Sequence, residues 1–242
     1  MVSSLQQQRA IITGASSGIG KATALKFAEA GCNLVLVARS SEKLTLVAEE
    51  VSAFGVEAKI YPLDLSQVAE VQSRFEAIAQ DSGPIDFLIN NAGMGYTNLL
   101  RDTSITDWQQ VLDLNLTSIF QATMGVLPSM RDRKQGTIIH IASIAANIAF
   151  PNWGAYCVSK AALVTFAKVL AIEERENGIR VMTISPGSVN TPIWDTDTVQ
   201  ADFDRALMLT PDIVAQTILQ AALLPLEVVI DEMTIISNAG TL

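Results

Sequence analysis

The sequence is poor in the residues that build metal and disulfide sites. It has one histidine, His140, and two cysteines, Cys32 and Cys157, among 242 residues. A single histidine argues against a His-based metal site. In the run TIIHIAS we interpret His140 as a satisfied residue of a strand rather than as a ligand. Two cysteines are too few for a disulfide scaffold, so we expect a reducing compartment and no bound metal.

Long apolar runs and an excess of positive charge are also missing. Pro, Glu or Asp interrupts the apolar stretches before the roughly 18 residues needed to span a bilayer. The amino terminus, MVSSLQQQRAIITG, has no basic segment followed by an apolar run, so it does not resemble a secretory signal. Sixteen basic against 25 acidic residues give a net charge of −9. We therefore expect a cytoplasmic protein with no nucleic-acid or membrane partner.

What the chain does have is a 49% hydrophobic content and a regular alternation of patterns. No composition break divides it, so we expect a single domain over residues 1–242. Short β-branched runs alternate with segments of helical spacing, and the expected strands are 10–13, 33–38, 58–63, 86–90, 137–142, 180–185 and 228–237. Near-continuous apolar strands separated by helices predict a parallel, doubly wound α/β sheet covered on both faces. Ligands bind beyond the carboxyl ends of such strands.

The first expected strand runs directly into a glycine-rich turn. Residues 13–20 read TGASSGIG, and a helical pattern, KATALKFAEAG, follows at once. Gly14, Gly18 and Gly20 allow a tight turn that lets a pyrophosphate approach the backbone and the free N–H groups of the helix. Glycines here can also serve geometry alone, but the strand–glycine–helix context favours a dinucleotide site.

The residues after the second expected strand indicate which dinucleotide is bound. A site for NAD usually has a carboxylate here, which accepts hydrogen bonds from the ribose hydroxyls. This chain has Ala38 followed by Arg39 and Ser40. A guanidinium suits the 2′-phosphate of NADP(H). The alternative is an ordinary solvated arginine, and we favour NADP(H) over NAD(H).

Further candidates follow the third and fourth expected strands. Asp64 can accept a hydrogen bond from an adenine amino group with Leu65 beside the ring, or it can cap the next helix together with Ser66. These two roles are compatible. The fourth strand leads into NNAG at 90–93, where small residues let a cofactor lie close and asparagine can bond to local backbone.

The fifth expected strand leads into residues suited to carbonyl chemistry. It ends at Ser143, Tyr156 follows 13 positions later, and Lys160 lies four positions beyond Tyr156. Tyr156 and Lys160 therefore share one face of a helix. Tyrosine can donate a proton to an alkoxide, and a nearby ammonium lowers the pKa of its hydroxyl. Ser143 can hold the carbonyl oxygen from the other side. The three side chains together predict a site that polarises and protonates a carbonyl.

With these motifs in order, nearly the whole chain resembles the classical short-chain dehydrogenase/reductase family. The resemblance rests on TGASSGIG (13–20), NNAG (90–93), Asn115, Ser143, Tyr156-x-x-x-Lys160, and Pro186-Gly187 followed by Thr191. It implies a Rossmann-like fold and an oxidoreductase that uses a nicotinamide cofactor.

The resemblance also implies roles for individual residues. Tyr156 would be the acid/base, Ser143 would orient the substrate, and Lys160 would bond the nicotinamide ribose. Asn115 would hold a water that links Lys160 to solvent. Many NADP-using relatives have a second basic residue in the glycine turn, where this chain has Ser17. The candidate cofactor-binding residues are Gly14, Ser16, Ser17, Gly18, Ile19, Gly20, Arg39, Ser40, Asp64, Leu65, Asn91, Ala92, Gly93, Tyr156, Lys160, Pro186, Gly187, Val189 and Thr191.

The segment 191–210 is expected to close over a small-molecule carbonyl or alcohol substrate. In relatives the part after Pro186-Gly187 does so, and here it contains Trp194, Phe203 and Met208. Other candidates for the pocket wall are Met94, Tyr96, Asn147, Phe150 and Trp153. For each of these residues, we favour a packing role over contact with the substrate.

The expected helices at about 105–130 and around Tyr156 have apolar positions on more than one face, such as Ile119 and Val126. Packing within one chain explains this pattern, and so does burial against a second copy. Because relatives pair these helices, we expect a homotetramer, with a dimer as the alternative.

Three functions remain open from the sequence. The favoured one is an NADP-dependent oxidoreductase that acts on a carbonyl or secondary alcohol. A 3-oxoacyl-carrier-protein reductase fits the size, although the acidic chain has no obvious basic patch for an acidic carrier. A dinucleotide-sensing protein without catalysis is the third, but such proteins usually lack the tyrosine or the lysine.

Overall fold

The apolar runs of the sequence form one parallel sheet. The computed structural model describes residues 5–201 and 203–240, and its strands lie in the order β3-β2-β1-β4-β5-β6-β7. Every pair of neighbouring strands is parallel. The strands are β1 (Arg9–Thr13), β2 (Asn33–Ala38), β3 (Ala58–Pro62), β4 (Phe87–Asn90), β5 (Gly136–Ile141), β6 (Ile179–Pro186) and β7 (Glu232–Ile235). The predicted α/β fold is confirmed, and the last strand is shorter than expected.

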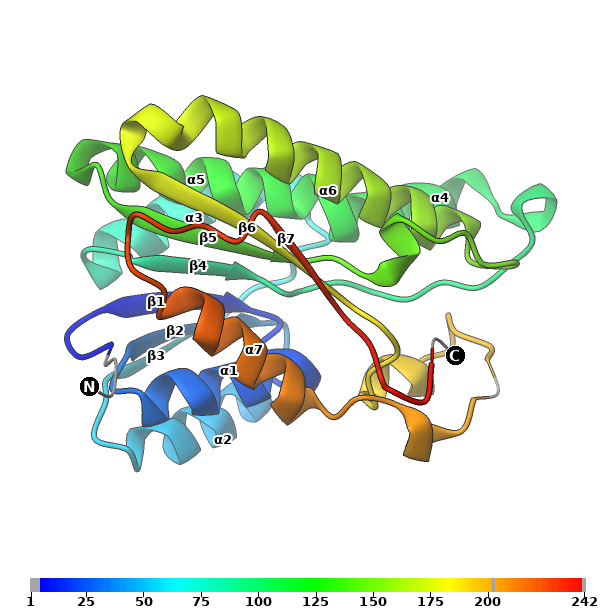
Figure 1. Ribbon diagram of the computed structural model, residues 1–242, viewed down its shortest axis with the longest axis horizontal. Helices are drawn as coiled ribbons and strands as arrows, with labels where there is room; N and C mark the ends of the chain where they lie inside the picture. Colours follow the sequence, from blue (N-terminus) through cyan, green and yellow to red (C-terminus); the bar gives the residue numbers. More distant parts are fainter. Residues whose placement is uncertain (1–4, 202, 241–242) are drawn as a thin grey trace.

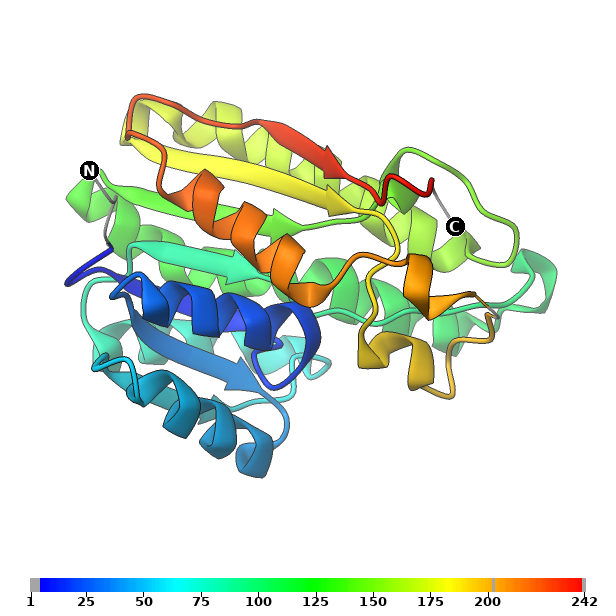
Figure 2. The same cartoon turned by 60° about the horizontal axis from the view of Figure 1, so that its bottom comes forward.

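Helices cover both faces of this sheet (Figure 1). One face carries α1 (Gly18–Glu29), α2 (Ser41–Ser52) and α7 (Pro211–Ala222). The other carries α3 (Val68–Ser82), α5 (Ser118–Arg133) and α6 (Gly154–Glu174). In Figure 2, turned by 60°, the orange α7 lies beside the blue α1, which agrees with the contacts between these two helices.

The two helix layers explain why the strands are apolar at nearly every position. Successive strand residues point to opposite faces. Ile12 packs with the residues of α1 and α7, while its neighbour Ile11 packs with those of α3 and α5. Both side chains are fully buried. The strand therefore cannot show the alternation of polar and apolar residues that is typical of a strand with one face in solvent.

The helix expected at about 105–130 is continuous but changes its winding in the middle. It begins as α4 (Ile105–Leu112), passes through a π-helical turn at Asp113–Thr117, and continues as α5. A π-turn adds one residue to a helical turn and occurs frequently at functional sites. The turn has Asn115 at its centre.

The longest helix, α6, is rich in apolar residues. Contrary to the expectation from the sequence, no Pro, Glu or Asp interrupts it before Glu173, and an 18-residue window within Gly154–Asn177 has a mean hydropathy of 1.6, enough to cross a membrane by length and composition alone. It packs along β6 and buries Lys160 and Glu174. A helix that lies on a sheet in this way has the same composition as a membrane span.

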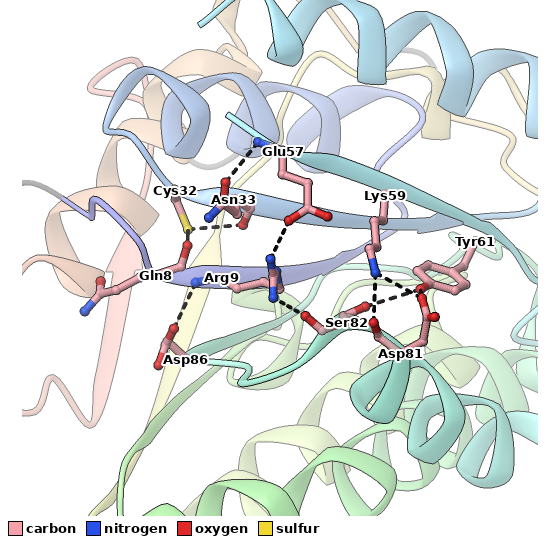
Figure 3. Close-up of polar contacts among 10 residues, drawn as sticks. All are labelled: Gln8, Arg9, Cys32, Asn33, Glu57, Lys59, Tyr61, Asp81, Ser82 and Asp86. Carbon is pink, nitrogen blue, oxygen red and sulfur yellow. Dashed lines mark hydrogen bonds and ion pairs between the residues drawn. The ribbon is translucent and has the colours of Figure 1, made fainter. Parts of the chain in front are cut away.

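Polar contacts tie the segments together at the edge of the sheet where the strands begin (Figure 3). The backbone N–H of Arg9 donates to Asp86 at 2.9 Å, and its guanidinium contacts Glu57 and the carbonyl of Ser82. Nearby, Asp81 at the end of α3 accepts from Lys59 and Tyr61 of β3. This amino-edge network, defined by the residues drawn in Figure 3, leaves the opposite edge for the segments that follow the strands.

Candidate active site

A cleft opens at the carboxyl edge of the sheet, between the segments that follow β5 and β6 and the start of α6. It has about 740 Å³ of space that is continuous with solvent. Its lining includes Ser143, Trp153, Tyr156, Gly187, Thr191 and Trp194. These residues are far apart in sequence and come together because parallel strands end at the same edge.

The three residues predicted to act on a carbonyl lie together in the structure. Ser143 follows β5, and Tyr156 lies in the first turn of α6. Both side chains line the cleft, and the Ser143 hydroxyl lies near enough to the Tyr156 phenol to influence its acidity. Lys160, one turn further along α6, has its ammonium 5.8 Å from the centroid of the Tyr156 ring.

Burial dominates the acid–base properties of the pair on α6. It raises the pKa of Tyr156 above its ordinary value, and the hydrogen bond from Ser143 partly opposes this effect. Burial also lowers the pKa of Lys160 to about 8. The sequence predicted that Lys160 would lower the tyrosine pKa. In the structure without a cofactor, removal of the phenolate from water has the larger effect, so the predicted lowering remains a proposal for the loaded site.

Lys160 keeps unused hydrogen-bonding capacity. Its Nζ donates to the carbonyl of Ile141 at 3.0 Å. An ammonium has three N–H groups, and among the described residues the other two have no partner. The side chain therefore keeps two donors beside Tyr156, which lines the cleft, and this suits a ligand rich in hydroxyl groups.

Asn115 is held rigidly by its neighbours. Its Oδ1 accepts from the N–H of Met94 at 2.8 Å, and its Nδ2 donates to the carbonyl of Met94 and to Oγ of Ser159 at 2.9 and 3.1 Å. The residue is fully buried. Both amide hydrogens are used, so only a lone pair of Oδ1 is left in the side chain for the water that the sequence analysis expects it to hold.

Gly93 leaves a small space between Asn115 and Lys160. A Cβ at this position would lie 3.1 Å from Oδ1 of Asn115 and 3.5 Å from Nζ of Lys160. The two polar atoms therefore border the same region, and a side chain other than hydrogen there would crowd both.

The glycine turn after β1 fits a pyrophosphate. Gly14 and Gly18 have φ values of +66° and +53°, which strain other residues, and a Cβ on Gly20 would lie 2.2 Å from the carbonyl oxygen of Gly14. Ser17 at the start of α1 makes no side-chain cap, so the first N–H groups of the helix have no partner from it. Asn91, which directly follows β4, holds the glycine turn because its Nδ2 donates to the carbonyl of Thr13 at 3.0 Å. Oδ1 of Asn91 takes no part in this contact.

The residues expected around the adenosine are only partly available. Arg39 is exposed and has no hydrogen-bond or ion-pair partner among the described residues. Ser40 caps α2 by accepting from the N–H of Lys43. Asp64 uses Oδ1 to accept from both N–H and Oγ of Ser66, which forms a local turn; it does not cap α3, which begins at Val68 and has no side-chain cap at Gln67. Leu65 is 5% exposed and packs in the core, so little of its side chain faces an adenine ring.

Comparison with known proteins identifies the family. Residues 8–202 match the family model for short chain dehydrogenase. The chain belongs to this family. The resemblance drawn from the motifs is thereby confirmed, together with the fold that it implied.

Individual relatives of this short-chain dehydrogenase differ in the activity for which they are named. The chain is 37% identical over 216 residues to an uncharacterized oxidoreductase of Mycobacterium tuberculosis, covering 87% of this chain and 62% of that relative. It is 36% identical to a 3-oxoacyl-[acyl-carrier-protein] reductase of Synechocystis, covering 80% and 79%. The crystal structure of L-sorbose reductase from Gluconobacter frateurii complexed with NADPH and L-sorbose is 30% identical, covers 98% of each chain, and has a TM-score of 0.88.

In this short-chain dehydrogenase the loop after β6 meets the glycine turn. Pro186 ends β6, and the N–H of Gly187 donates to the carbonyl of Ile235 at 2.8 Å. Val189 forms a β-bridge with Leu209. Thr191 lies next to Gly18, since a Cβ on that glycine would be 3.2 Å from its methyl group. The predicted nicotinamide loop therefore runs from the end of β6 to the start of α1.

Arg205 fastens the segment that was expected to form a lid. Its guanidinium donates to Oδ1 of Asn190, to the carbonyl of Thr191 and to Oδ1 of Asp195, at 2.9, 3.2 and 2.6 Å. It also lies 6.0 Å from the centroid of the Trp194 ring. The clasp joins two short helical turns, Pro192–Asp195 and Arg205–Leu207, on one side of the cleft.

The wall candidates divide into two groups. Phe150, Trp153, Trp194 and Phe203 line the cleft. The others have packing roles: Met94 and Tyr96 cluster with Val111, Asn147 bonds to Glu232, and Met208 is 8% exposed in the lid segment.

Sequence reasoning missed several residues that hold the site in place. Oγ1 of Thr13 accepts from the N–H groups of Asn91 and Ala92, both at 3.0 Å, and so joins the glycine turn to the end of β4. Ser159 links Asn115 to α6, and Met94 holds both ends of the Asn115 amide. The one sequence signal for these residues was the position of Ser159 within the motif Y-x-x-x-K, where it immediately precedes the lysine and faces the interior.

Proposed function

We propose that the chain is an NADP-dependent oxidoreductase that interconverts a carbonyl and a secondary alcohol, with Tyr156 as the acid/base. One observation supports this most directly: Tyr156 and Ser143 line the same cleft, and the Ser143 hydroxyl influences the acidity of the Tyr156 phenol. A carbonyl oxygen bound between them would receive a hydrogen bond from each hydroxyl.

The residues of the chain divide the work as follows. NADPH, when bound, supplies the hydride for the carbonyl carbon. Ser143 donates a hydrogen bond that orients the carbonyl, and Tyr156 donates its phenolic proton to the oxygen as negative charge develops there. Lys160 uses its two free N–H groups for the ribose hydroxyls, and its positive charge stabilises the phenolate that forms. Asn115 and Gly93 border the space from which a water can return the proton through Lys160.

Removal of the Tyr156 hydroxyl tests the proposal. Tyr156→Phe should lower kcat for NADPH-dependent carbonyl reduction by at least about 100-fold, the usual contribution of a positioned acid, while the Kd for NADPH changes only a few-fold. Tyr61→Phe is the matched control, because it removes a phenol hydroxyl from the amino-edge network. Turnover of Tyr156→Phe at the wild-type rate would refute the mechanism. If neither the wild type nor Tyr156→Phe reduces a carbonyl while both still bind NADPH, the dinucleotide-sensing alternative would be favoured.

We also propose that NADP(H) is preferred over NAD(H). The exposed, unpartnered guanidinium of Arg39 and the absence of a carboxylate at Ala38 support this preference. The relative complexed with NADPH is consistent with it. The double variant Ala38→Asp/Arg39→Leu should shift the kcat/KM ratio toward NADH by at least about 10-fold, while Arg74→Leu, which removes an exposed arginine from α3, leaves the ratio unchanged. Equal efficiency of the wild type with both cofactors would contradict the proposal.

A 3-oxoacyl thioester is the second candidate substrate, because the Synechocystis relative carries that activity in its name. Reduction of acetoacetyl-coenzyme A with a kcat/KM above that for simple ketones would favour it. The net charge of −9 argues against docking of an acidic carrier protein.

We further propose that the enzyme is cytoplasmic and a homo-oligomer, a tetramer or else a dimer. Support comes from large apolar side chains that are exposed on the outer surfaces of α5 and α6, including Phe120, Val169 and Ile172. Light scattering at working concentration measures the mass, and a monomer would contradict the proposal.

A further inference from the structure

The side of the cleft next to Tyr156 is a row of aromatic rings. Trp153 packs edge-to-face on Tyr156 with 5.3 Å between centroids, Trp194 packs on Trp153 at 5.7 Å, and Phe203 packs on Trp194 at 5.4 Å. The interplanar angles are 68°, 70° and 89°. This aromatic row starts at the proposed catalytic hydroxyl and extends into the lid segment.

The row offers almost no polar groups to a ligand. The indole N–H of Trp194 donates to the carbonyl of Val189 at 2.7 Å, so the indole N–H of Trp153 is the one donor that the two tryptophans leave without a partner among the described residues. The side-chain hydroxyls in the lining of the cleft belong to Ser143, Tyr156, Ser188 and Thr191. The first two are assigned to the reacting oxygen. A substrate that carries several hydroxyls of its own would therefore leave most of them without partners.

No basic side chain lines the cleft among the described residues. The residues outside the described ranges include no lysine, arginine or histidine. Arg205, close to Trp194, already has its guanidinium bonded to Asn190, Thr191 and Asp195. Lys160 does not line the cleft: it is 4% exposed, and its two remaining N–H groups are assigned to the ribose hydroxyls of the cofactor. A carboxylate or phosphate on the substrate would enter an apolar cleft without a counter-charge, which is strongly unfavourable.

The place of Trp153 indicates where an apolar group of the substrate lies. Trp153 immediately precedes α6 and contacts the ring of Tyr156, so the indole lies beside the ring that carries the proposed proton donor. A ring attached directly to the carbonyl carbon can then pack edge-to-face or offset against the indole.

We propose that the substrate is an uncharged ketone, or the corresponding secondary alcohol, with an aromatic or alicyclic ring next to the carbonyl that packs on Trp153, Trp194 and Phe203. The inference rests on the proposed function and adds the substrate class. It separates this chain from its relative that binds L-sorbose, a sugar with several hydroxyl groups.

Three ketones test the inference with the wild-type enzyme and NADPH. Acetophenone has the apolar ring, 4-acetylbenzoate adds one carboxylate to it, and L-sorbose replaces it by hydroxyl groups. We expect kcat/KM for acetophenone to exceed that for either of the others by at least about 100-fold, the scale of discrimination set by unpaired polar groups. Equal or better reduction of 4-acetylbenzoate or L-sorbose would overturn the inference and leave the proposed function intact. NADPH oxidation with none of the three would count against the proposed function and the inference together.

A pair of variants tests the missing counter-charge. Phe150 lines the cleft but is not in the aromatic row, and Ile148 is 44% exposed two residues earlier and does not line it. Phe150→Arg should raise kcat/KM for 4-acetylbenzoate by at least about 10-fold relative to acetophenone, because it supplies the charge that the cleft lacks. Ile148→Arg should leave both values within about twofold, with NADPH affinity unchanged in both variants. An equal effect of the two arginines, or no gain in Phe150→Arg that folds and binds NADPH, would contradict the inference.

Discussion

Lys160 has a positive charge in a place where charge is costly. The side chain is 4% exposed, and burial lowers the pKa of its ammonium from 10.5 to about 8. Its single hydrogen bond, to the carbonyl of Ile141, offsets only part of the lost hydration. The fold therefore keeps an unfavourably buried charge, as is common at functional sites.

The cost of Lys160 predicts a pH-dependent stability. Because the pKa is lower in the folded than in the unfolded state, the unfolded chain binds more protons between pH 8 and 10.5, and stability rises with pH in that window. Wild type should gain about 2 kcal/mol in the free energy of unfolding relative to Lys160→Met between pH 7 and 9.5. Urea unfolding of both proteins without cofactor measures the difference, and parallel pH curves would contradict the buried-ammonium argument.

The burial of His140 predicts that the protein loses stability at acidic pH. It is fully buried beside Asn90 and Phe166, and burial lowers its pKa to about 3, with Lys160 adding to the effect. The imidazole is neutral in the fold but takes up a proton in the unfolded chain below pH 6.5, so stability falls as the pH is lowered from there toward 3.

As the only histidine in the chain, His140 makes the effect easy to isolate. Between pH 7 and 4.5, wild type should lose about 2 kcal/mol in the free energy of unfolding relative to His140→Leu. Denaturant titrations at the two pH values measure this change, and a constant difference between the proteins would show that the imidazole titrates normally.

At the scale of elements, the π-turn between α4 and α5 joins the helix layer to the site. Its central residue, Asn115, bonds to Met94 after β4 and to Ser159 on α6. Ser159 in turn donates to the carbonyl of Tyr156 at 2.7 Å. Three segments are thus held in one arrangement by a buried amide and a buried hydroxyl.

Loss of the Ser159 hydroxyl should loosen this junction. Ser159→Ala removes one partner from the Asn115 amide, and we expect it to cost about 1–2 kcal/mol of stability and to lower kcat more than it changes KM. Thr165→Ala is the control on the same helix, since its hydroxyl bonds only to the carbonyl of Ala161 one turn away. Thermal unfolding and steady-state kinetics of both variants decide the matter. Equal losses would mean that Ser159 is merely another helix residue.

The elements also show what can and cannot be predicted from the sequence. The runs at 33–38 and 58–63 reappear almost unchanged as β2 and β3, because apolar β-branched stretches between helical patterns have few alternatives in a parallel sheet. The helix expected at 105–130 was predicted in extent, but its π-turn was not. That turn depends on partners such as Met94 and Ser159, which local spacing does not reveal.

The candidate site was predictable to a similar degree. Ser143, Tyr156 and Lys160 have chemistry that stands out in an apolar context, and they lie together. The role of Arg205 was not visible, because an arginine in an acidic lid segment looks solvated until its contacts to Asn190 and Thr191 are known. Leu65 was expected beside a ligand, and the structure shows that most of its side chain packs in the core, so its contact with a ligand stays a prediction.

At the scale of the whole molecule, Arg180 fastens the last helix to the sheet. The side chain lies at the start of β6 and is 7% exposed. It bonds to Oγ1 of Thr137 on β5, and its acceptors beyond α7 are the carbonyls of Ala222, Leu224, Pro225 and Val228. A guanidinium can serve this many carbonyls at the negative end of a helix, and a single ammonium cannot.

Replacement of Arg180 should therefore weaken the entire fold. Arg180→Met leaves the buried carbonyl of Ala222 and three partly buried carbonyls without this donor, and we expect a loss on the order of 3 kcal/mol in the free energy of unfolding, with Arg180→Lys only partly restoring it. The exposed Arg175, at the end of α6, provides the control Arg175→Met, which should cost less than about 0.5 kcal/mol. Chemical denaturation measures all three, and equal midpoints for the two Met variants would refute the fastening role.

The amino-edge network places a dense set of ionic contacts at the end of the sheet farthest from the cleft (Figure 3). Arg9, Glu57, Asp81 and Asp86 secure the strands there without touching the residues that line the cleft. Substitutions at the amino edge of the sheet should therefore have little effect on the cleft, and substitutions in the cleft little effect on the amino edge. In a directed-evolution experiment that varies Phe150, Trp194 or Phe203 for new substrates, the distant end of the sheet can be stabilised first. The protein would then tolerate destabilising substitutions in the cleft.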